Sequence, residues 1–209
     1  MRVTIHQPNY LPWRGFVEKA RVADVLVLLD TVQFSKGSYT NRTRMRSNSA
    51  EGWSWMTVPV HHRLGQSIGC VEVVDDGWRS RHFSWLKQTY QRSPFWRTME
   101  PILRPVYATS WSSLGPLNSV LISVLLEAFA VETRIVMASG LGCRGIGSDY
   151  LLAICQELGA TTYLSGESGP DYLDMGSFTA SGIDVQVSRF QPNCYPPYSA
   201  VDDLFMEEE

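Results

Sequence analysis

The chain has 209 residues, of which 44% are hydrophobic and 19% are charged. This length suits one ordinary domain, and the proportion of hydrophobic to charged residues excludes a wholly disordered chain and a coiled coil. No apolar run reaches the roughly 18 to 20 residues that a membrane-spanning helix needs, and the first residues lack the apolar core of a signal peptide. We therefore expect a single domain over residues 1–209, cytoplasmic and without membrane insertion.

Charge is distributed unevenly between the two halves of the chain. Residues 1–104 hold 15 basic and 8 acidic residues, a net charge of +7, whereas residues 105–209 hold 3 and 13, a net charge of −10. The basic half could attract a phosphate-bearing ligand. The overall charge of −3 and the lack of a recognition-helix or zinc-finger pattern argue against a nucleic-acid partner.

The first elements follow a β-loop-α-β order. Residues 2–5 are short and β-branched, which predicts a strand, and the Pro-interrupted segment 6–13 predicts an ordered loop. Apolar residues at helical spacing predict a helix over 16–23, and the apolar run 24–30 predicts a buried strand. Such strands joined through a helix indicate a parallel sheet with right-handed crossovers. The predicted fold class is α/β, a mainly parallel sheet flanked by helices (Rossmann-like or HUP-like).

A mixed strand and helix excursion is expected around residues 35–110. Residues 31–52 are too polar and basic for a core element, so we expect a loop or a sheet edge there. The alternation of 53–60 predicts a strand that a proline ends, and 68–74 predicts a further strand. Residues 78–92 predict a helix.

The second half of the chain alternates helices with strands. We expect helices over 114–130, 149–158 and 178–183, and strands over 133–137, 161–164 and 185–190. Gly159 should end the middle helix, because glycine tolerates the left-handed conformation that often follows a helix. The Pro-rich segment 192–197 and the acidic end are expected to be irregular.

Two loops after predicted strands carry polar side chains. Ligands of open α/β sheets bind outside the carboxyl ends of the strands. His6, Gln7 and Asn9 after the first strand offer a proton acceptor with two amides that could orient a substrate. The same side chains could instead only satisfy backbone groups of their own loop.

The second polar loop spans residues 165–169 and continues to Asp171 and Asp174. Its glycines would let backbone N–H groups approach an anion, and either aspartate could bind a ribose, an amine or a metal. A purely structural Ser/Gly turn is the alternative reading of the same residues.

The basic segment 36–46 is a candidate phosphate site. Alternate residues of an extended chain point the same way, so Arg42, Arg44 and Arg46 could share one face, with Lys36 close by. A solvated basic edge would have the same composition.

Cysteine and metal chemistry have weak support in the sequence. Cys70 and Cys155 fall in apolar elements and are expected to pack. Cys143 and Cys194 fall in loops and are the candidate nucleophiles, although neither has a histidine nearby in sequence. The pair at 61–62 is more typical of a solvated turn, so no metal site is expected.

Several of these segments resemble the WbqC-like protein family. The strongest is IHQPNYLPWRGF at residues 5–16. The others lie at 23–36, 41–42, 52–53, 57–60, 163–166, 171–174, 178–183 and 195–196. The likeness covers nearly the whole chain, but Pro197 stands where the family usually has glutamine, directly after a tyrosine-proline pair that Cys194 precedes.

The resemblance implies a bacterial biosynthetic protein, because members are encoded among genes for O-antigen sugars, other surface polysaccharides and specialised metabolites. We therefore expect a transferase that acts on an amino sugar or an amine-containing natural product, with acyl or aminoacyl transfer from the thioester of coenzyme A or of a phosphopantetheine carrier protein. The expected catalytic residues are His6 and Asp171. The expected substrate-binding residues are Gln7, Asn9, Tyr10, Trp13, Asn41, Arg42, Ser165, Gly166, Ser168 and Tyr172.

Two alternatives remain open at this stage. The order of strand, histidine loop, helix, strand and late Gly/Ser loop is similar to the start of nucleotidylyltransferases with a HxGH signature, although the second histidine is missing. This likeness implies nucleotidyl transfer from a nucleoside triphosphate with Mg²⁺. The other alternative is a binding protein without catalytic activity, and the sequence leaves the oligomeric state open.

Overall fold

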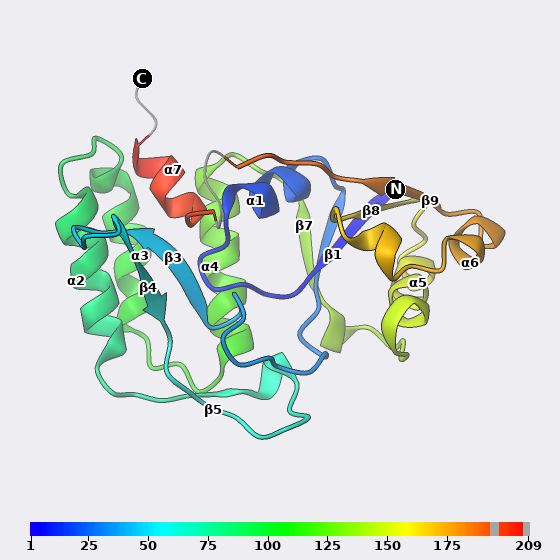
Figure 1. The fold of residues 1–209 in the computed structure, drawn as a ribbon, viewed down its shortest axis with the longest axis horizontal. Helices are drawn as coiled ribbons and strands as arrows, with labels where there is room; N and C mark the ends of the chain where they lie inside the picture. The colour runs from blue at the N-terminus through cyan, green and yellow to red at the C-terminus, as the bar shows by residue number, and fades with distance from the viewer. Residues whose placement is uncertain (193–196, 207–209) are drawn as a thin grey trace.

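The computed structural model describes residues 1–192 and 197–206. Its central element is a five-stranded parallel sheet of order β7-β2-β1-β8-β9 (Figure 1). The strands are β1 (Arg2–His6), β2 (Val25–Leu28), β7 (Arg134–Met137), β8 (Thr162–Ser165) and β9 (Asp184–Val187). The strand order reverses between β1 and β8, which makes their shared carboxyl edge the topological switch point. The predicted α/β class with a parallel sheet is confirmed.

Helices cover both faces of the sheet because its strands are apolar on both sides. Leu26 and Leu28 of β2 face a core that includes α1 and α4, whereas the alternate residues Val25 and Val27 face α5 and α6. The helices are α1 (Arg14–Arg21), α4 (Leu114–Ala128), α5 (Gly147–Glu157) and α6 (Met175–Ala180). Gly159 has φ +66° after α5, as the sequence predicts.

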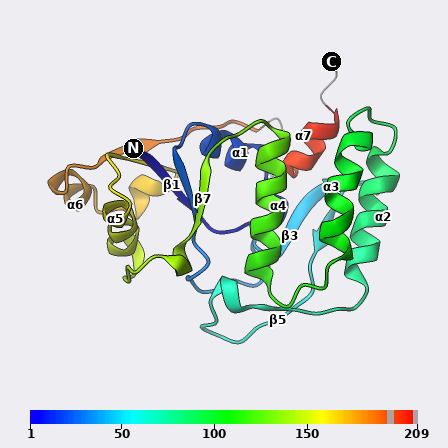
Figure 2. The same ribbon diagram turned by 180° about the vertical axis from the view of Figure 1, so that it is seen from behind.

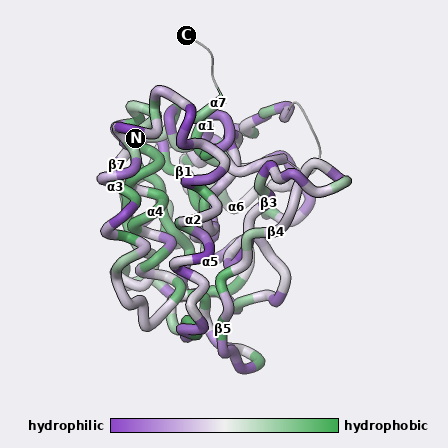
Figure 3. Tube along the Cα trace, turned by 90° about the vertical axis from the view of Figure 1, so that its left-hand side faces the viewer, coloured by the Kyte–Doolittle hydropathy of each residue, from purple (hydrophilic) through white to green (hydrophobic). Residues whose placement is uncertain are grey.

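Between β2 and β7 the chain builds the excursion. Its elements are β3 (Arg42–Arg46), β4 (Trp53–Thr57), β5 (Val60–His61), β6 (Glu72–Val73), α2 (Trp78–Tyr90) and α3 (Trp96–Ala108). In both ribbon views α4 lies between the sheet and the α2–α3 pair (Figure 2). Helix α4 is coloured largely as hydrophobic (Figure 3), which fits a helix with apolar neighbours on several sides. No described helix is long and apolar enough to cross a membrane.

The excursion refines one sequence-based expectation and corrects another. Of the basic segment expected as a loop or a sheet edge, residues 42–46 form β3, an edge strand that pairs antiparallel with β4 in a two-stranded sheet. Arg42 stacks over Trp55 and Arg44 over Trp53, so the guanidinium groups are covered by indole rings instead of being fully solvated. The expected strand at 68–74 is instead a 3₁₀ turn, η1 (Ile68–Cys70), followed by the two residues of β6.

Two helices were not expected from the sequence. Helix α3 contains Pro101 and Pro105, which argue against a helix locally, yet its apolar side is buried against α2 and α4. Helix α7 (Ala200–Met206) lies between the Pro-rich segment and the acidic end, in a stretch for which the sequence predicts no element. Phe205 of α7 stacks on Tyr90 at 4.7 Å between ring centroids, and this contact holds α7 on the excursion.

Candidate functional site

A pocket of about 380 Å³ opens at the switch point, above the carboxyl ends of β1 and β8. Three loops or turns contribute to it, together with one residue of α1 and the start of α5. Its lining residues are Ile5, His6, Gln7, Lys19, Leu29, Val32, Gly147, Tyr150, Leu151, Tyr163, Gly166, Glu167, Ser168, Gly169 and Tyr172. We call this the switch-point pocket. The structure thus brings together the two polar loops that the sequence singles out.

His6 enters this pocket from the last position of β1. Its ring lies 4.8 Å from the ring of Phe16 on α1, in an edge-on arrangement that fixes its orientation. Nδ1 lies 2.9 Å from the carbonyl oxygen of Gln7, and because a carbonyl only accepts, Nδ1 carries the proton and Nε2 is the free acceptor. Burial, together with the positive charge of Lys19, lowers the pKa of His6 to about 3, so the imidazole is neutral at physiological pH.

Lys19 is the residue in this pocket that the sequence analysis missed. It lies one turn after Phe16 on the buried face of α1, and only 6% of it is exposed. Its ammonium forms no hydrogen bond or ion pair with any residue in the described part of the chain, and burial lowers its pKa to about 8. The available signal was a lysine among Phe16, Val17 and Ala20, where helical spacing predicts an apolar stripe.

The turn after β8 is built around Ser165 and Gly169. Ser165 is fully buried, and its hydroxyl donates to the carbonyl of Gly166 at 3.0 Å, so it supports the turn from below. A Cβ at position 169 would overlap the Oγ of Ser165, which explains why a glycine is needed there. The pocket is therefore lined by Gly166, Ser168 and Gly169, while Ser165 lies behind them.

The loop that carries His6 and Gln7 is held by contacts with the excursion. Asn118, fully buried on α4, donates to the carbonyls of Pro8 and Thr40, each at 2.7 Å. Thr43 of β3 donates to the carbonyl of Leu11 at 3.0 Å. These buried hydrogen bonds fix the backbone of residues 8–11, and this fixed loop supports His6 at the end of β1.

The comparisons with known proteins place this chain. The model of the WbqC-like protein family matches residues 7–208. The chain belongs to the WbqC-like protein family. Among curated relatives, the uncharacterized protein Rv1507c of Mycobacterium tuberculosis (strain ATCC 25618 / H37Rv) is 27% identical over 200 residues, which cover 94% of this chain and 85% of that protein. No solved structure matches the chain.

Other predicted residues of this WbqC-like protein lie away from the switch-point pocket. Asp171 is exposed in η3 (Gly169–Asp171) and does not line the pocket. Tyr10 is fully buried and its hydroxyl bonds to His82 Nδ1 at 2.8 Å and to the Tyr107 hydroxyl at 2.9 Å, so it is in no position to touch a ligand there. Asn41 is also buried, and its amide donates to the Val58 carbonyl at 3.0 Å.

Asn9 and the basic segment also lie apart from this pocket. Asn9 is 6% exposed in the loop that Asn118 holds. Lys36 is exposed, and the arginines of β3 stack on aromatic rings; Arg44 lies between Trp53 and Tyr198. The four basic candidates of this segment do not line the switch-point pocket: Lys36, Arg42, Arg44 and Arg46.

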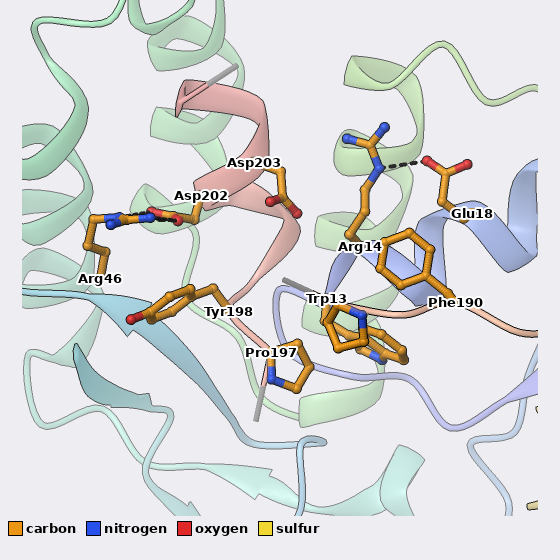
Figure 4. A pocket seen from close by; sticks show the side chains of 10 residues that line it. Trp13, Arg14, Glu18, Arg46, Phe190, Pro197, Tyr198, Asp202 and Asp203 are labelled. Carbon is orange, nitrogen blue, oxygen red and sulfur yellow. Dashed lines mark hydrogen bonds and ion pairs between the residues drawn. The ribbon is translucent and has the colours of Figure 1, made fainter. Parts of the chain in front are cut away.

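A second cavity, of about 660 Å³, lies beside the other face of α1 (Figure 4). Trp13 and Phe190 meet edge-on there, at 5.7 Å between ring centroids. Its two arginines are both engaged by carboxylates: Arg46 bonds to Asp202, and Arg14 bonds to Glu18. Trp13 and Arg46, predicted as ligand contacts, therefore lie in this cavity and apart from His6.

Cys143, the candidate cysteine nucleophile that the structure describes, is not brought to His6. Cys143 is partly exposed before α5, does not line the pocket, and has a raised pKa because of desolvation. Cys194 lies outside the described residues. Cys155 is buried on α5, as expected, whereas Cys70 is exposed because its segment is a 3₁₀ turn instead of a strand.

Proposed function

We propose that this WbqC-like protein is a biosynthetic transferase that acylates or aminoacylates an amine in the switch-point pocket. The observation that carries the proposal is the neutral imidazole of His6, with Nε2 free to accept a proton, in a pocket at the carboxyl edge of β1 and β8. Ligands of α/β sheets bind at this edge, and an unprotonated imidazole there can take a proton from an acceptor amine.

The reaction would proceed by direct transfer from a thioester. Nε2 of His6 takes a proton from the amine as its nitrogen attacks the thioester carbonyl carbon. A C–N bond forms and the C–S bond breaks, and the proton passes from His6 to the departing thiolate. Direct transfer agrees with the position of Cys143, whose raised pKa disfavours the thiolate that a covalent acyl intermediate requires.

The low basicity of His6 sets a condition on this mechanism. A general base works best when its pKa is near the working pH, and a pKa of about 3 makes the imidazole a weak base. Two features of the pocket lower the pKa of His6, the burial of the ring and the charge of Lys19. A substrate that brings negative charge close to Lys19 would offset the second of these and make His6 more basic.

The test measures thiol release and product mass. The protein would be incubated with coenzyme A thioesters and N-acetylcysteamine aminoacyl thioesters, with glucosamine and small diamines as acceptors. His6→Gln should lower turnover by roughly 10²- to 10⁴-fold, the usual contribution of one positioned base. His61→Gln, at an exposed position of β5, is the control and should retain full turnover. Equal turnover of His6→Gln and wild type would refute the role of His6.

A second candidate function is nucleotidyl transfer. The observation that favours it is the strand order, which places β1 at the centre of the sheet, with the start of α5 and the Gly166–Gly169 turn lining the same pocket. Nucleotides commonly bind at such a switch point, with phosphates near glycine-rich turns and helix N-termini. Release of pyrophosphate from ATP and Mg²⁺ that depends on His6, without any use of thioesters, would select this function over acyl transfer.

A further inference from the structure

Lys19 has an environment that a structural lysine does not need. Only 6% of the residue is exposed on α1, and it lines the switch-point pocket, to which its ammonium is open. The ammonium has no hydrogen-bond or ion-pair partner among residues 1–192 and 197–206. A buried charge without a partner is costly, and proteins normally pair it or replace it with an apolar side chain. The unpaired ammonium therefore points to a partner that comes from outside the chain.

Other parts of the pocket favour the same kind of partner. Helix α5 begins at the pocket with Gly147, and its N-terminus has no side-chain cap. Backbone N–H groups at such an end attract negative charge. Across the pocket, Gly166 leaves open space where a side chain would stand, whereas the N–H of Gly169 already donates to the Gly166 carbonyl at 2.9 Å and holds the turn in shape. Glu167 is the acidic residue of the lining, and it is exposed, whereas burial alone accounts for the shifted pKa of Lys19.

We propose that the switch-point pocket holds a small oxyanion, a phosphate or carboxylate group of the substrate, against Lys19. This inference rests on the proposed function, since it takes the pocket as the place where substrate reacts. It adds a requirement, which is that the substrate carries an anionic group beside the amine or donor group that reacts. The anionic group of the substrate would also offset the charge of Lys19 and so raise the pKa of His6.

The test is direct binding of simple anions, which needs no turnover. Inorganic phosphate, acetate and chloride would be titrated at constant ionic strength, with calorimetry for the dissociation constant and thermal unfolding for Tm. The wild-type protein should bind phosphate or acetate more tightly than chloride. Phosphate as the tighter ligand assigns a phosphate substrate, acetate a carboxylate substrate, and equal weak binding of all three ions overturns the proposal.

Lysine variants identify the residue responsible. The chain has three lysines, and Lys87, exposed on α2, gives a matched control. Lys19→Met should bind the preferred anion about tenfold to a hundredfold more weakly, as expected for loss of a hydrogen bond to a charged group. Lys87→Met should bind it as the wild type does. Unchanged binding in a folded Lys19→Met protein overturns the assignment.

A His6 variant separates this inference from the proposed function. His6→Gln should retain anion binding within about threefold, because the charged hydrogen bond to Lys19 is intact. If His6→Gln loses turnover and still binds the anion, both proposals hold. If thioesters and nucleotides are all inert but the anion binds through Lys19, the transferase proposal fails and the anion site remains. ¹⁵N spectra of His6 supply the second readout: the anion should raise the pKa of His6 in the wild type and leave it unchanged in Lys19→Met.

Discussion

Lys19 and His6 line one pocket, where burial makes the charged form of each less favourable. The positive charge of Lys19 further lowers the pKa of His6, whereas burial alone lowers the pKa of Lys19. Groups with strongly shifted pKa values in a cleft are candidate functional residues, because a fold gains no stability from such an arrangement. This pair gives two predictions that do not depend on knowing the substrate.

Replacing Lys19 by Met should stabilise the protein. The pKa of Lys19 falls from 10.5 to about 8, so folding penalises its charged form, and relief of that penalty should add roughly 1 to 3 kcal/mol to the free energy of unfolding at neutral pH. Between pH 8 and 10.5 the unfolded chain binds the proton more strongly than the folded chain, so the wild type regains stability as pH rises through that window.

Urea unfolding of both proteins, at neutral pH and near pH 10.5, measures this difference. The gap between variant and wild type should shrink at the higher pH. Lys87→Met is the control and should stay within about 0.5 kcal/mol of the wild type at both, as surface substitutions usually do. A Lys19→Met protein that is less stable than the wild type would show that the ammonium has a stabilising partner.

His6 should remain neutral, with its proton on Nδ1, down to a pH near 3. The chain has four histidines, so ¹⁵N-histidine spectra are simple, and His6→Gln identifies the signal. The folded pKa is below the ordinary 6.5, so the unfolded chain binds more protons between pH 6.5 and 3, and stability is lost as pH falls through this window. His6→Gln should make that loss shallower. A His6 signal that titrates near its ordinary pKa contradicts the burial described here.

The sequence predicts the framework of this pocket better than its chemistry. The predicted strands at 2–5 and 161–164, each followed by a polar loop or turn, are enough to place two loops at one edge of a parallel sheet. Periodicity predicts α4 and α5 because their apolar faces are regular. The parts that the sequence leaves open or misses depend on long-range contacts: the covered arginines of β3 on stacking with Trp53 and Trp55, and α3 on burial that overrides two prolines.

Assignment of site residues from their place in a motif has a similar limit. Tyr10 belongs to the same HQPNYLPW string as His6, yet it is fully buried and bonded to His82 and Tyr107. The loop after β1 needs residues that anchor it, and an anchoring residue can be polar or aromatic just as a ligand-binding residue can. Lys19 shows the opposite case, because a residue that looks like ordinary helix surface lies on the buried side of α1.

Gly169→Ala should destabilise the protein and distort the turn that lines the pocket. The new methyl group would overlap the Oγ of Ser165 and also approach its Cβ to 2.8 Å, and overpacking of this kind typically costs about 1 to 3 kcal/mol. Gly166→Ala is the matched control in the same turn, because a Cβ there has no neighbour within 4 Å. The double variant Ser165→Gly/Gly169→Ala should recover part of the loss. Urea unfolding of the wild type, Ser165→Gly, Gly169→Ala and the double variant provides the cycle, and additive effects would contradict the proposed overlap.

Arg46→Met should destabilise the protein through Asp202, which lies in the second cavity (Figure 4). Arg46 makes a two-point contact with this buried carboxylate, Nε to Oδ1 at 3.1 Å and Nη2 to Oδ2 at 3.0 Å, and Tyr90 donates to Oδ1 at 2.9 Å. Without the guanidinium, Asp202 keeps its burial but loses its counter-charge. Since half of the Arg46 side chain is exposed, solvent screening limits the expected loss to roughly 1 to 2 kcal/mol.

The matched control is Arg81→Met, because Arg81 pairs with Asp76 at 2.9 Å and both side chains are exposed. That pair should contribute at most a few tenths of a kcal/mol, about as little as exposed ion pairs usually do. If the loss in Arg46→Met comes from an uncompensated carboxylate, then Asp202→Asn should reduce it, because the amide is neutral and can still accept from Tyr90. Urea unfolding of Arg46→Met, Asp202→Asn and the double variant gives the coupling between the two positions, and a coupling near zero would assign the loss to the stacking of Arg46 on Tyr198 instead.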